Sequence, residues 1–256
     1  MPKLPELTER DSLALVLCFK FRVLTEEQIQ VLCNFSTIKT TSRRMRILEK
    51  RGYVKREKVL PNIPMCYTAT QKTAEYLGLH MKPYKIALAT ILHEIAIVDI
   101  AIYILLRRKI EISQVMTDKE QFYYAFYNNK EIQQIPKKNK HRPDLLILDE
   151  KVLIEYERTL KTKSRYLKNA IENCASYKGY KHFWIIEESI KTMKKPLEQE
   201  LEKRGIEYSV VFMSDIRKYI SRTKNEIKIT LDDDYGSALN NYELQLSEMM
   251  EQGVIE

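Results

Sequence analysis

Two short apolar runs in the middle of the chain constrain its fold more than any other feature. Residues 145–148 and 152–154 are apolar throughout, and three charged residues separate them. Runs of this length indicate strands that are covered on both faces of a sheet. We therefore expect strands at 143–148 and 151–157, joined by a two-residue turn at Asp149–Glu150.

Such a turn fixes the register of the two strands. It pairs Leu148 with Lys151, and counting outward from this pair places Asp144 directly opposite Glu155. Side chains alternate between the two faces of a strand, so Glu157 lies on the same face as Glu155. Carboxylates that face each other across a ladder repel. The sequence thus predicts three converging carboxylates with a hard cation, Mg²⁺ or Mn²⁺, between them.

A cation held by Asp144 and Glu155 suits phosphodiester hydrolysis, because it lowers the pKa of a bound water and neutralises charge that develops on the phosphate. His141 is a candidate phosphate ligand or proton donor, although a plain surface role fits its position equally well. A structural reading of the acids also stays open, since strands that end in solvent often carry them. The flanking bases that are candidates to hold phosphate oxygens are Lys138, Lys140, Arg142, Lys161 and Lys163.

The pattern on either side of these strands predicts a domain at 84–230. Two tightly joined strands, followed by strands that alternate with helices, indicate an α/β fold around a mixed sheet. The expected elements are a helix at 86–108, strands near 111–117 and 121–127, a basic loop at 136–142, a helix at 162–178, a strand at 182–187, a helix at 189–204 and a strand at 207–213.

An N-terminal domain at 1–83 is predicted from three helices followed by two strands, the pattern of a winged helix-turn-helix. Each helix begins at a residue with N-cap chemistry, and Gly52 ends the third. The N-caps are Thr8, Thr25 in a capping box with Gln28, and Ser36 or Thr37. The strands are expected at 53–59 and 64–70, and a further helix at 72–80.

The third helix carries basic residues near its start, where a recognition helix would meet a groove of DNA. A winged helix with a structural or protein-binding role is the open alternative. The candidate DNA-binding residues are Lys39, Arg43, Arg44 and Arg46, and those expected to face the core are Ile38, Met45 and Leu48.

The charge distribution favours a polyanionic partner. The net charge is +8, but residues 231–256 hold seven acids and no Lys or Arg, so the preceding residues carry a net charge of +15. A basic body of this kind suggests nucleic acid. We treat 231–256 as an acidic tail that contains at most a helix at 239–251.

Several other classes of protein are disfavoured. No apolar run reaches the length of a membrane span, so we expect no membrane segment. The four cysteines are scattered without a CxxC pair, which favours a reducing cytoplasm over a disulfide or zinc framework. The four histidines form no His-x-His pair, and the chain has no Gly-rich phosphate loop.

The acidic motif and its surroundings resemble a known family. Pro143-Asp144, ten further residues and then Glu155-Tyr-Glu157 resemble the PD-(D/E)XK nuclease motif in its ExE variant. More narrowly, the order of elements over 8–187 is similar to the replication-relaxation proteins and to plasmid mobilisation relaxases of the MobC and TraX type. This resemblance implies a mixed α/β (α+β overall) chain, in which a winged helix-turn-helix precedes a restriction-endonuclease-like α/β/α domain.

The resemblance also implies an activity: a relaxase that binds double-stranded DNA at a plasmid transfer origin and nicks one strand, alongside accessory mobilisation proteins. It implies an acidic metal ligand from the helix at 86–108, for which Glu94 is the candidate and Asp99 a competitor. The chain departs from the family pattern at Glu157, which occupies the position of the usual lysine. Lys161 or Lys163 then fills that role, or Glu157 serves as an extra ligand or base.

Two alternatives to the relaxase remain. One is a non-enzymatic DNA-binding replication or transcription factor, in which the nuclease-like domain serves only as a scaffold. The other is a nuclease of the restriction or transposition type.

Overall fold

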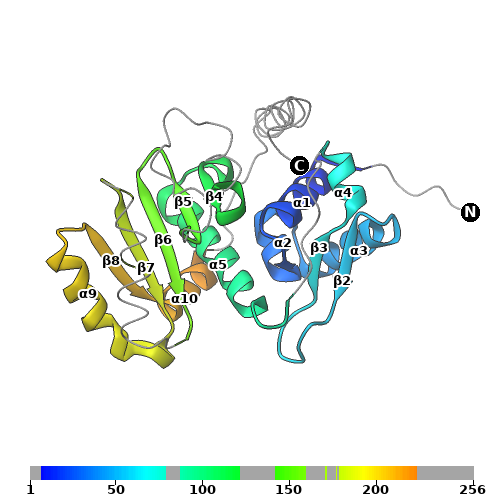
Figure 1. Cartoon of the computed structure of the whole chain (residues 1–256). Helices are drawn as coiled ribbons and strands as arrows, with labels where there is room; N and C mark the ends of the chain where they lie inside the picture. Colours follow the sequence, from blue (N-terminus) through cyan, green and yellow to red (C-terminus); the bar gives the residue numbers. More distant parts are fainter. Residues whose placement is uncertain are drawn as a thin grey trace, which may run out of the picture. The chain divides into compact units, whose positions relative to one another are not determined.

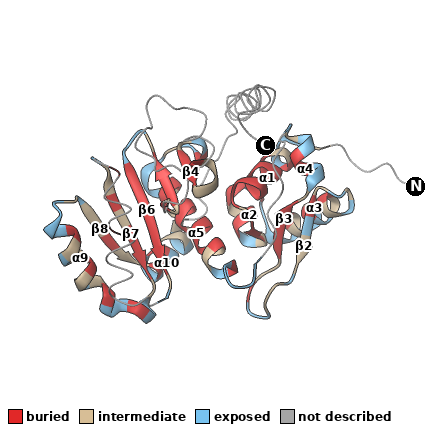
Figure 2. Ribbon diagram, in the orientation of Figure 1, coloured by how far each residue is buried: buried red, intermediate tan, exposed pale blue. Residues whose placement is uncertain are grey.

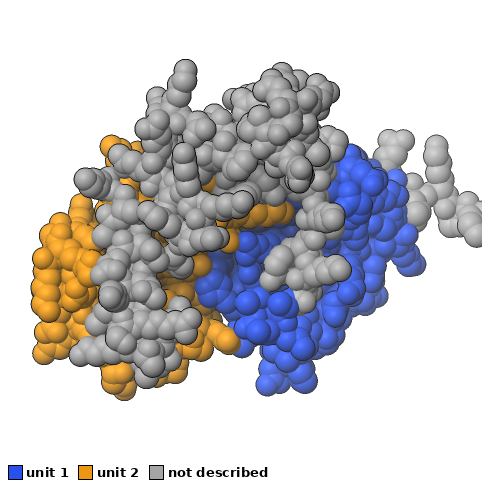
Figure 3. Space-filling view, viewed as in Figure 1, with its two compact units in different colours: residues 1–106, 223–256 blue, residues 107–222 orange. Residues whose placement is uncertain are grey.

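The chain folds into two compact units, each of which is described by itself. The computed structural model describes residues 7–78, 87–121, 142–159, 171, 177 and 179–223. The first unit comprises residues 1–106 and 223–256, and the second comprises residues 107–222 (Figure 3). The predicted acidic tail at 231–256 lies outside the described residues.

The first unit begins with three helices and continues with a small antiparallel sheet. Its three strands lie in the order β1-β3-β2. The helices and the hairpin follow one another as the sequence predicted, whereas the two-residue strand β1 was not expected. The elements are α1 (Glu9–Lys20), β1 (Leu24–Thr25), α2 (Glu26–Leu32), α3 (Ile38–Lys50), β2 (Val54–Glu57), β3 (Cys66–Ala69), α4 (Gln71–Tyr76) and α5 (Ile91–Arg108).

Side-chain caps define where the first three helices begin. Thr8 and Thr25 each accept a hydrogen bond from the third residue of the following helix, and both form the complete capping box. Thr37 caps α3 through the backbone N–H of Thr40. Gly52 follows α3 with a φ of +78°, a conformation that favours glycine. These local signals are the reason that the helix boundaries could be predicted.

Helix α5 packs with the first unit rather than opening a separate domain at residue 84. Gln28 donates hydrogen bonds to the carbonyl oxygen of Ile95 at 2.8 Å and to Oδ1 of Asp99 at 2.7 Å. Ile91, at the start of α5, is buried in a cluster with Val23 and the hairpin residue Cys66. The residues that α5 packs against therefore determine which unit it joins. The apolar periodicity within α5 predicts a helix but does not indicate its packing partners.

A buried ion pair ties α1 to α3. Arg44 donates from Nε to Oδ1 of Asp11 at 2.6 Å and from Nη2 to the other carboxylate oxygen, and the Asp11 side chain is fully buried. Burial acts to raise the pKa of the Asp11 carboxyl, but hydrogen bonds from Arg44 and Thr8 outweigh it and hold the pKa below its ordinary value. Arg44 was predicted to contact DNA; the structure turns it inward instead.

We predict that Arg44→Ala destabilises the first unit by about 3 kcal/mol, because it leaves the Asp11 carboxylate buried without its partner. Arg43→Ala, on the exposed side of the same helix, should change stability by less than about 0.5 kcal/mol. Urea titrations followed by helical circular dichroism test both. The difference should shrink below about pH 4, because a carboxyl with a lowered pKa contributes its stability above the unfolded value. Equal midpoints for both variants would contradict the role assigned to the pair.

The second unit is built on a five-stranded mixed sheet in the order β4-β5-β6-β7-β8 (Figure 1). Strand β5 pairs antiparallel with both β4 and β6, and β6, β7 and β8 are parallel. The mixed α+β architecture predicted from the sequence is confirmed. The elements are η1 (Ile112–Gln114), β4 (Val115–Thr117), β5 (Leu145–Ile147), β6 (Val152–Glu157), β7 (Lys181–Ile186), η3 (Glu188–Met193), α9 (Lys194–Lys203), β8 (Tyr208–Phe212) and α10 (Met213–Thr223).

Three elements of this unit differ from the sequence predictions or fall partly outside the described residues. The strand expected at 121–127 begins with Gln121 in a helical turn, and its other residues lie outside the described part. Of the helix expected at 162–178, the structure describes Ile171, which is helical, and Tyr177. Helix α10 was not predicted, although Ile216, Tyr219 and Ile220 recur at helical spacing.

The second unit's core lies on the sheet face that η3 and α9 cover. Leu153 and Trp184 from the strands meet Met193 and Leu197 from these two helices. Strand β6 is buried along its whole length (Figure 2). Among the described residues, no helix is both long and apolar enough to cross a membrane. The described cysteines, Cys18, Cys33 and Cys66, are buried and form no disulfide.

His182 is a buried titratable group on the same face. Its side chain is 1% exposed, and Nδ1 has no hydrogen-bond partner among the described residues. Burial lowers the pKa of this imidazole from 6.5 to about 4, because the charged form is poorly solvated. The unfolded chain therefore takes up a proton below pH 6.5 that the folded chain resists until about pH 4.

We predict that the second unit loses about 2 kcal/mol of stability at pH 5 relative to pH 7 through His182 alone. His182→Leu should remove this loss, because the variant has no imidazole to protonate. Trp184 is the one tryptophan of the chain and lies in this unit, so its fluorescence during urea unfolding reports the transition. The same acid sensitivity in the variant would show that other groups cause it.

Candidate functional site

The β5–β6 hairpin has the predicted register. Leu145 pairs with Ile154, Leu146 with Leu153 and Ile147 with Val152. Continuing this register by one residue places Asp144 opposite Glu155. The pairing arises from the turn, which is closed by a 3.0 Å hydrogen bond from the Lys151 N–H to the Leu148 carbonyl oxygen.

Side chains from outside the turn compensate for its unfavourable Asp-Glu sequence. Gln114 donates to Asp149 at 3.0 Å, and Arg108 donates to Glu150. The adjacent Lys151 has a φ of +51° without being glycine. These contacts hold a turn that local preference alone would not select.

The acidic residues of β6 are buried rather than solvated. Glu155 is 2% exposed and Glu157 is 5% exposed. They lie beside Trp184 and Ile186 in the parallel register with β7, and so on the face that η3 and α9 cover. Burying a carboxylate is costly unless a charge or hydrogen bonds compensate it. The reading of these acids as the solvated end of a strand is therefore wrong.

Asp144 lies immediately before β5 and turns toward the backbone of β6. Its Oδ2 accepts a 2.8 Å hydrogen bond from the N–H of Tyr156. This bond takes the place of a ladder bond at the point where β5 begins. Asp144 is thereby fixed beside Glu155 by main-chain geometry.

The predicted convergence of three carboxylates is not reproduced in the described part of the chain. No group of three or more His, Cys, Asp or Glu side chains there is placed to hold a metal ion. Two residues along a strand span roughly 6.5 Å, which separates Glu157 from Glu155 even though they share a face. The described acids thus form a cross-strand pair, Asp144 and Glu155, with Glu157 beyond it.

The other predicted metal and phosphate ligands have different placements. Glu94 belongs to the first unit, where it accepts a hydrogen bond from Arg22 at 3.0 Å. Arg142 is half-buried just before Pro143. The remaining candidates lie outside the described residues: Lys138, Lys140, His141, Lys161 and Lys163.

A polar cluster that the sequence analysis missed lies where β6 and β7 end. The Tyr156 hydroxyl donates to Oε1 of Glu187 at 2.7 Å, and Arg217 of α10 donates to the same oxygen at 3.0 Å. Burial and the bond to Glu187 raise the pKa of the Tyr156 hydroxyl, so it stays protonated as a donor. Recognising α10 from its apolar spacing would have placed Arg217 on a helix, but not next to Tyr156.

The first unit presents a basic stripe, defined as Lys39, Arg43, Arg46 and Lys50, along the exposed side of α3. All four side chains are exposed, and their spacing places them along one side of the helix. They form no hydrogen bond or ion pair with any residue that the structure describes. Lys50 was not among the predicted DNA-binding residues, although its position four residues after Arg46 places it on the same side of the helix.

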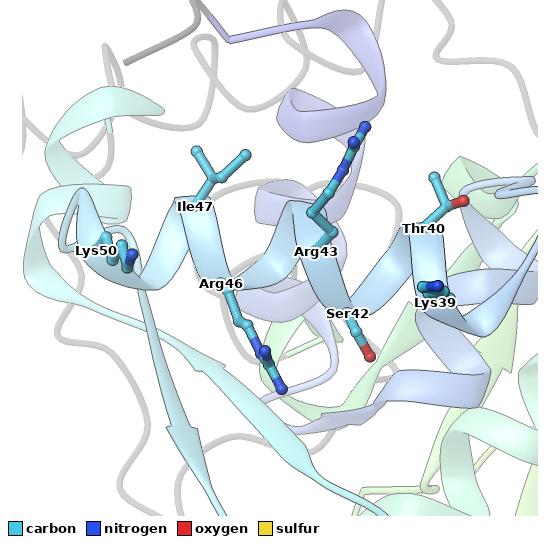
Figure 4. A pocket seen from close by; sticks show the side chains of 7 residues that line it. All are labelled: Lys39, Thr40, Ser42, Arg43, Arg46, Ile47 and Lys50. Atoms are coloured by element: carbon cyan, nitrogen blue, oxygen red, sulfur yellow. The ribbon is translucent and has the colours of Figure 1, made fainter. Parts of the chain in front are cut away.

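The basic stripe borders a hollow of about 750 Å³ whose described lining comes entirely from α3. In the view of Figure 4, Arg43 extends above the helix and Arg46 below it, so the two guanidinium groups lie at the two margins of the stripe. Ile38, predicted to face the core, is 39% exposed instead. Met45 and Leu48 are fully buried as predicted.

Ser42 does not point freely into this hollow. Its hydroxyl donates to Glu26 of α2, which also accepts a 2.9 Å hydrogen bond from the Tyr67 hydroxyl of β3. Glu26 therefore joins α2, α3 and the hairpin, and it fixes how α3 is presented.

Comparison with known proteins gives one match. A sequence model of a family described as replication-relaxation matches residues 15–188. The matched stretch extends from within α1 to the start of η3, so it includes α3 and the β5–β6 hairpin. No curated protein and no solved structure matches the chain.

We predict that Arg43→Ala combined with Arg46→Ala weakens binding to duplex DNA and lowers its salt dependence. Each lost phosphate contact should reduce the slope of log affinity against log salt by about 0.9. Fluorescence anisotropy with a labelled duplex at several salt concentrations measures this slope. Lys203→Ala, an exposed lysine of α9, is the control and should leave the slope unchanged. A double variant with the wild-type slope would exclude the basic stripe as the DNA contact.

Proposed function

The chain belongs to the replication-relaxation family, and from this premise we propose that it binds DNA through the basic stripe of α3 and nicks one strand at a plasmid transfer origin. The family suggests a part in plasmid replication or mobilisation, and with it an interaction with DNA. The observation that carries the nicking proposal is the register that places Asp144 opposite the buried Glu155. A relaxase of the MobC or TraX type is the specific form that we propose.

The proposal of DNA binding is supported by the charge and arrangement of α3. The order of three helices and a hairpin supports a winged helix-turn-helix, in which the third helix enters the major groove. The four cations of the basic stripe have no described partner that would have to be displaced by phosphate. The contact of Arg44 with Asp11 removes one predicted cation from this surface without weakening the stripe.

The proposal of nicking is supported by the buried acids at the end of β6. Carboxylate oxygens are the ligands that Mg²⁺ or Mn²⁺ prefers. A bound ion would in turn relieve the repulsion between two carboxylates that face each other across a ladder. Asp144 and Glu155 would hold the ion, which would lower the pKa of a bound water and neutralise charge on the phosphate. The mixed sheet supports a restriction-endonuclease-like domain as the scaffold for this pair.

A second candidate function is a DNA-binding replication factor without nuclease activity. One observation favours it: no third metal ligand joins Asp144 and Glu155 among the described residues. Glu157 at the position of the motif lysine points in the same direction. In this case the acid pair serves the fold, through the bond from Asp144 to the N–H of Tyr156.

Conversion of supercoiled plasmid to the open circle separates the two candidates. We expect the wild-type chain to nick in Mg²⁺ or Mn²⁺ and not in EDTA. Asp144→Asn and Glu155→Gln should each lower the rate by at least about 100-fold, because the loss of one carboxylate weakens cation binding. Asparagine can still accept from the N–H of Tyr156, so Asp144→Asn tests chemistry rather than folding.

The matched control is Asp215→Asn, the same substitution at an exposed residue of α10, which should keep the wild-type rate. A wild-type chain that binds DNA but leaves the plasmid supercoiled with every divalent ion would establish the second candidate. Nicking by Asp144→Asn at the wild-type rate would place the active site elsewhere.

A further inference from the structure

Strand β8 forms one edge of the second unit's sheet, and no strand of the described residues pairs with its outer side (Figure 1). Its five residues read YSVVF and include neither a charged residue nor proline. Natural edge strands are commonly protected by such residues or by being very short. Strand β4, at the opposite edge, has only three residues. The edge at β8 is therefore the longer one, and it lacks the usual protection.

The register with β7 determines which backbone groups of β8 remain open. His182 of β7 donates its N–H to the carbonyl oxygen of Glu207, the residue just before β8, at 2.8 Å. A strand in a parallel ladder bonds to its neighbour through alternate residues, so every second residue from Glu207 onward bonds to β7. The residues between them direct their N–H groups away from β7; they are Tyr208, Val210 and Phe212. None of these N–H groups donates to another residue that the structure describes.

These open groups are complementary to a second copy of themselves. If two copies of β8 lie antiparallel with Val210 opposite Val210, the two valines exchange both N–H···O bonds. The N–H of Phe212 then meets the carbonyl oxygen of Tyr208 of the second copy. Tyr208 and Phe212 also face each other as an aromatic cross-strand pair, which stabilises a ladder. This register overlaps all five residues of the strand.

Charges on α9 match the same antiparallel arrangement. The Tyr208 hydroxyl donates to the carboxylate of Glu202 at 2.6 Å, so one end of β8 lies beside an acid. At the other end, Nζ of Lys194 lies 5.2 Å from the centre of the Phe212 ring. Antiparallel pairing brings Glu202 of one copy toward Lys194 of the second copy, whereas parallel pairing would bring acid toward acid. Complementary charges of this kind fix the register and orientation of an interface.

We propose that β8 is a dimerisation edge, to which a second copy of this chain adds its own β8 antiparallel and centred on Val210. The two five-stranded sheets then continue as one. The interface is isologous, because both copies contribute the same residues. Pairing of this kind also removes the open edge from contact with unrelated strands. The inference concerns the second unit alone and does not depend on DNA binding or nicking.

An exchange of charges on α9 tests this pairing. Glu202→Lys and Lys194→Glu each place like charges across the interface and should raise the dissociation constant of the dimer at least about 10-fold. The double variant should restore it, because each lysine again meets a glutamate of the other copy. Lys195→Glu, at the next and exposed position of α9, is the control and should leave the dimer unchanged. Analytical ultracentrifugation at several protein concentrations measures the dissociation constant.

A backbone substitution gives a second test that does not depend on charge. Val210→Pro removes the N–H that would bond to the second copy, while the ladder with β7 uses the residues on either side of it. This variant should be monomeric. Val210→Ala loses side-chain packing but keeps the N–H, so it is the matched control and should still dimerise. Urea unfolding followed by Trp184 fluorescence shows whether each variant is folded.

The outcomes either support the proposal or overturn it. A wild-type chain that sediments as a monomer at every concentration would overturn it, whatever else covers β8. A dimer that resists both single charge reversals and Val210→Pro would place the interface elsewhere on the chain. If Val210→Pro does not fold, the loss and recovery of the dimer in the charge-exchange series decides.

Discussion

The hydrogen-bonded ladder between β5 and β6 is the constraint on which the candidate active site depends. A shift of one residue would move Glu155 and Glu157 to the opposite face and separate Asp144 from its partner. The register is held at the turn by the Lys151–Leu148 bond and along the ladder by apolar pairs. Local chemistry at one end of the hairpin thus determines which acids meet at the other.

The position of β6 in the sheet determines which residues lie near the acid pair. The strand pairs antiparallel with β5 and parallel with β7, so the start of one strand and the ends of two others share an edge. Polar side chains that lie far apart in the sequence gather there around Tyr156. Glu155 and Glu157 lie on the opposite face of β6 from the Tyr156 side chain and are buried beside a core that contains Trp184, where a bound cation would compensate their charge most strongly.

In the first unit, the basic helix α3 is anchored on one side and exposed on the other. Arg44 enters the interior and is neutralised by Asp11, while Ser42 is held by Glu26. The basic stripe on the other side of α3 keeps its charges available. Some polar residues of α3 thus hold the fold, and the others are exposed to solvent.

The sequence by itself determined the elements whose signals are local. The caps at Thr8, Thr25 and Thr37 placed three helices, and the two apolar runs with their short turn placed the β5–β6 register. Tertiary structure alone decided which unit α5 joins, that Arg44 faces inward and that Tyr156 and Arg217 share Glu187 as a partner. The reason is physical: caps and turns act within a few residues, whereas the direction of a long side chain depends on partners that only packing brings near.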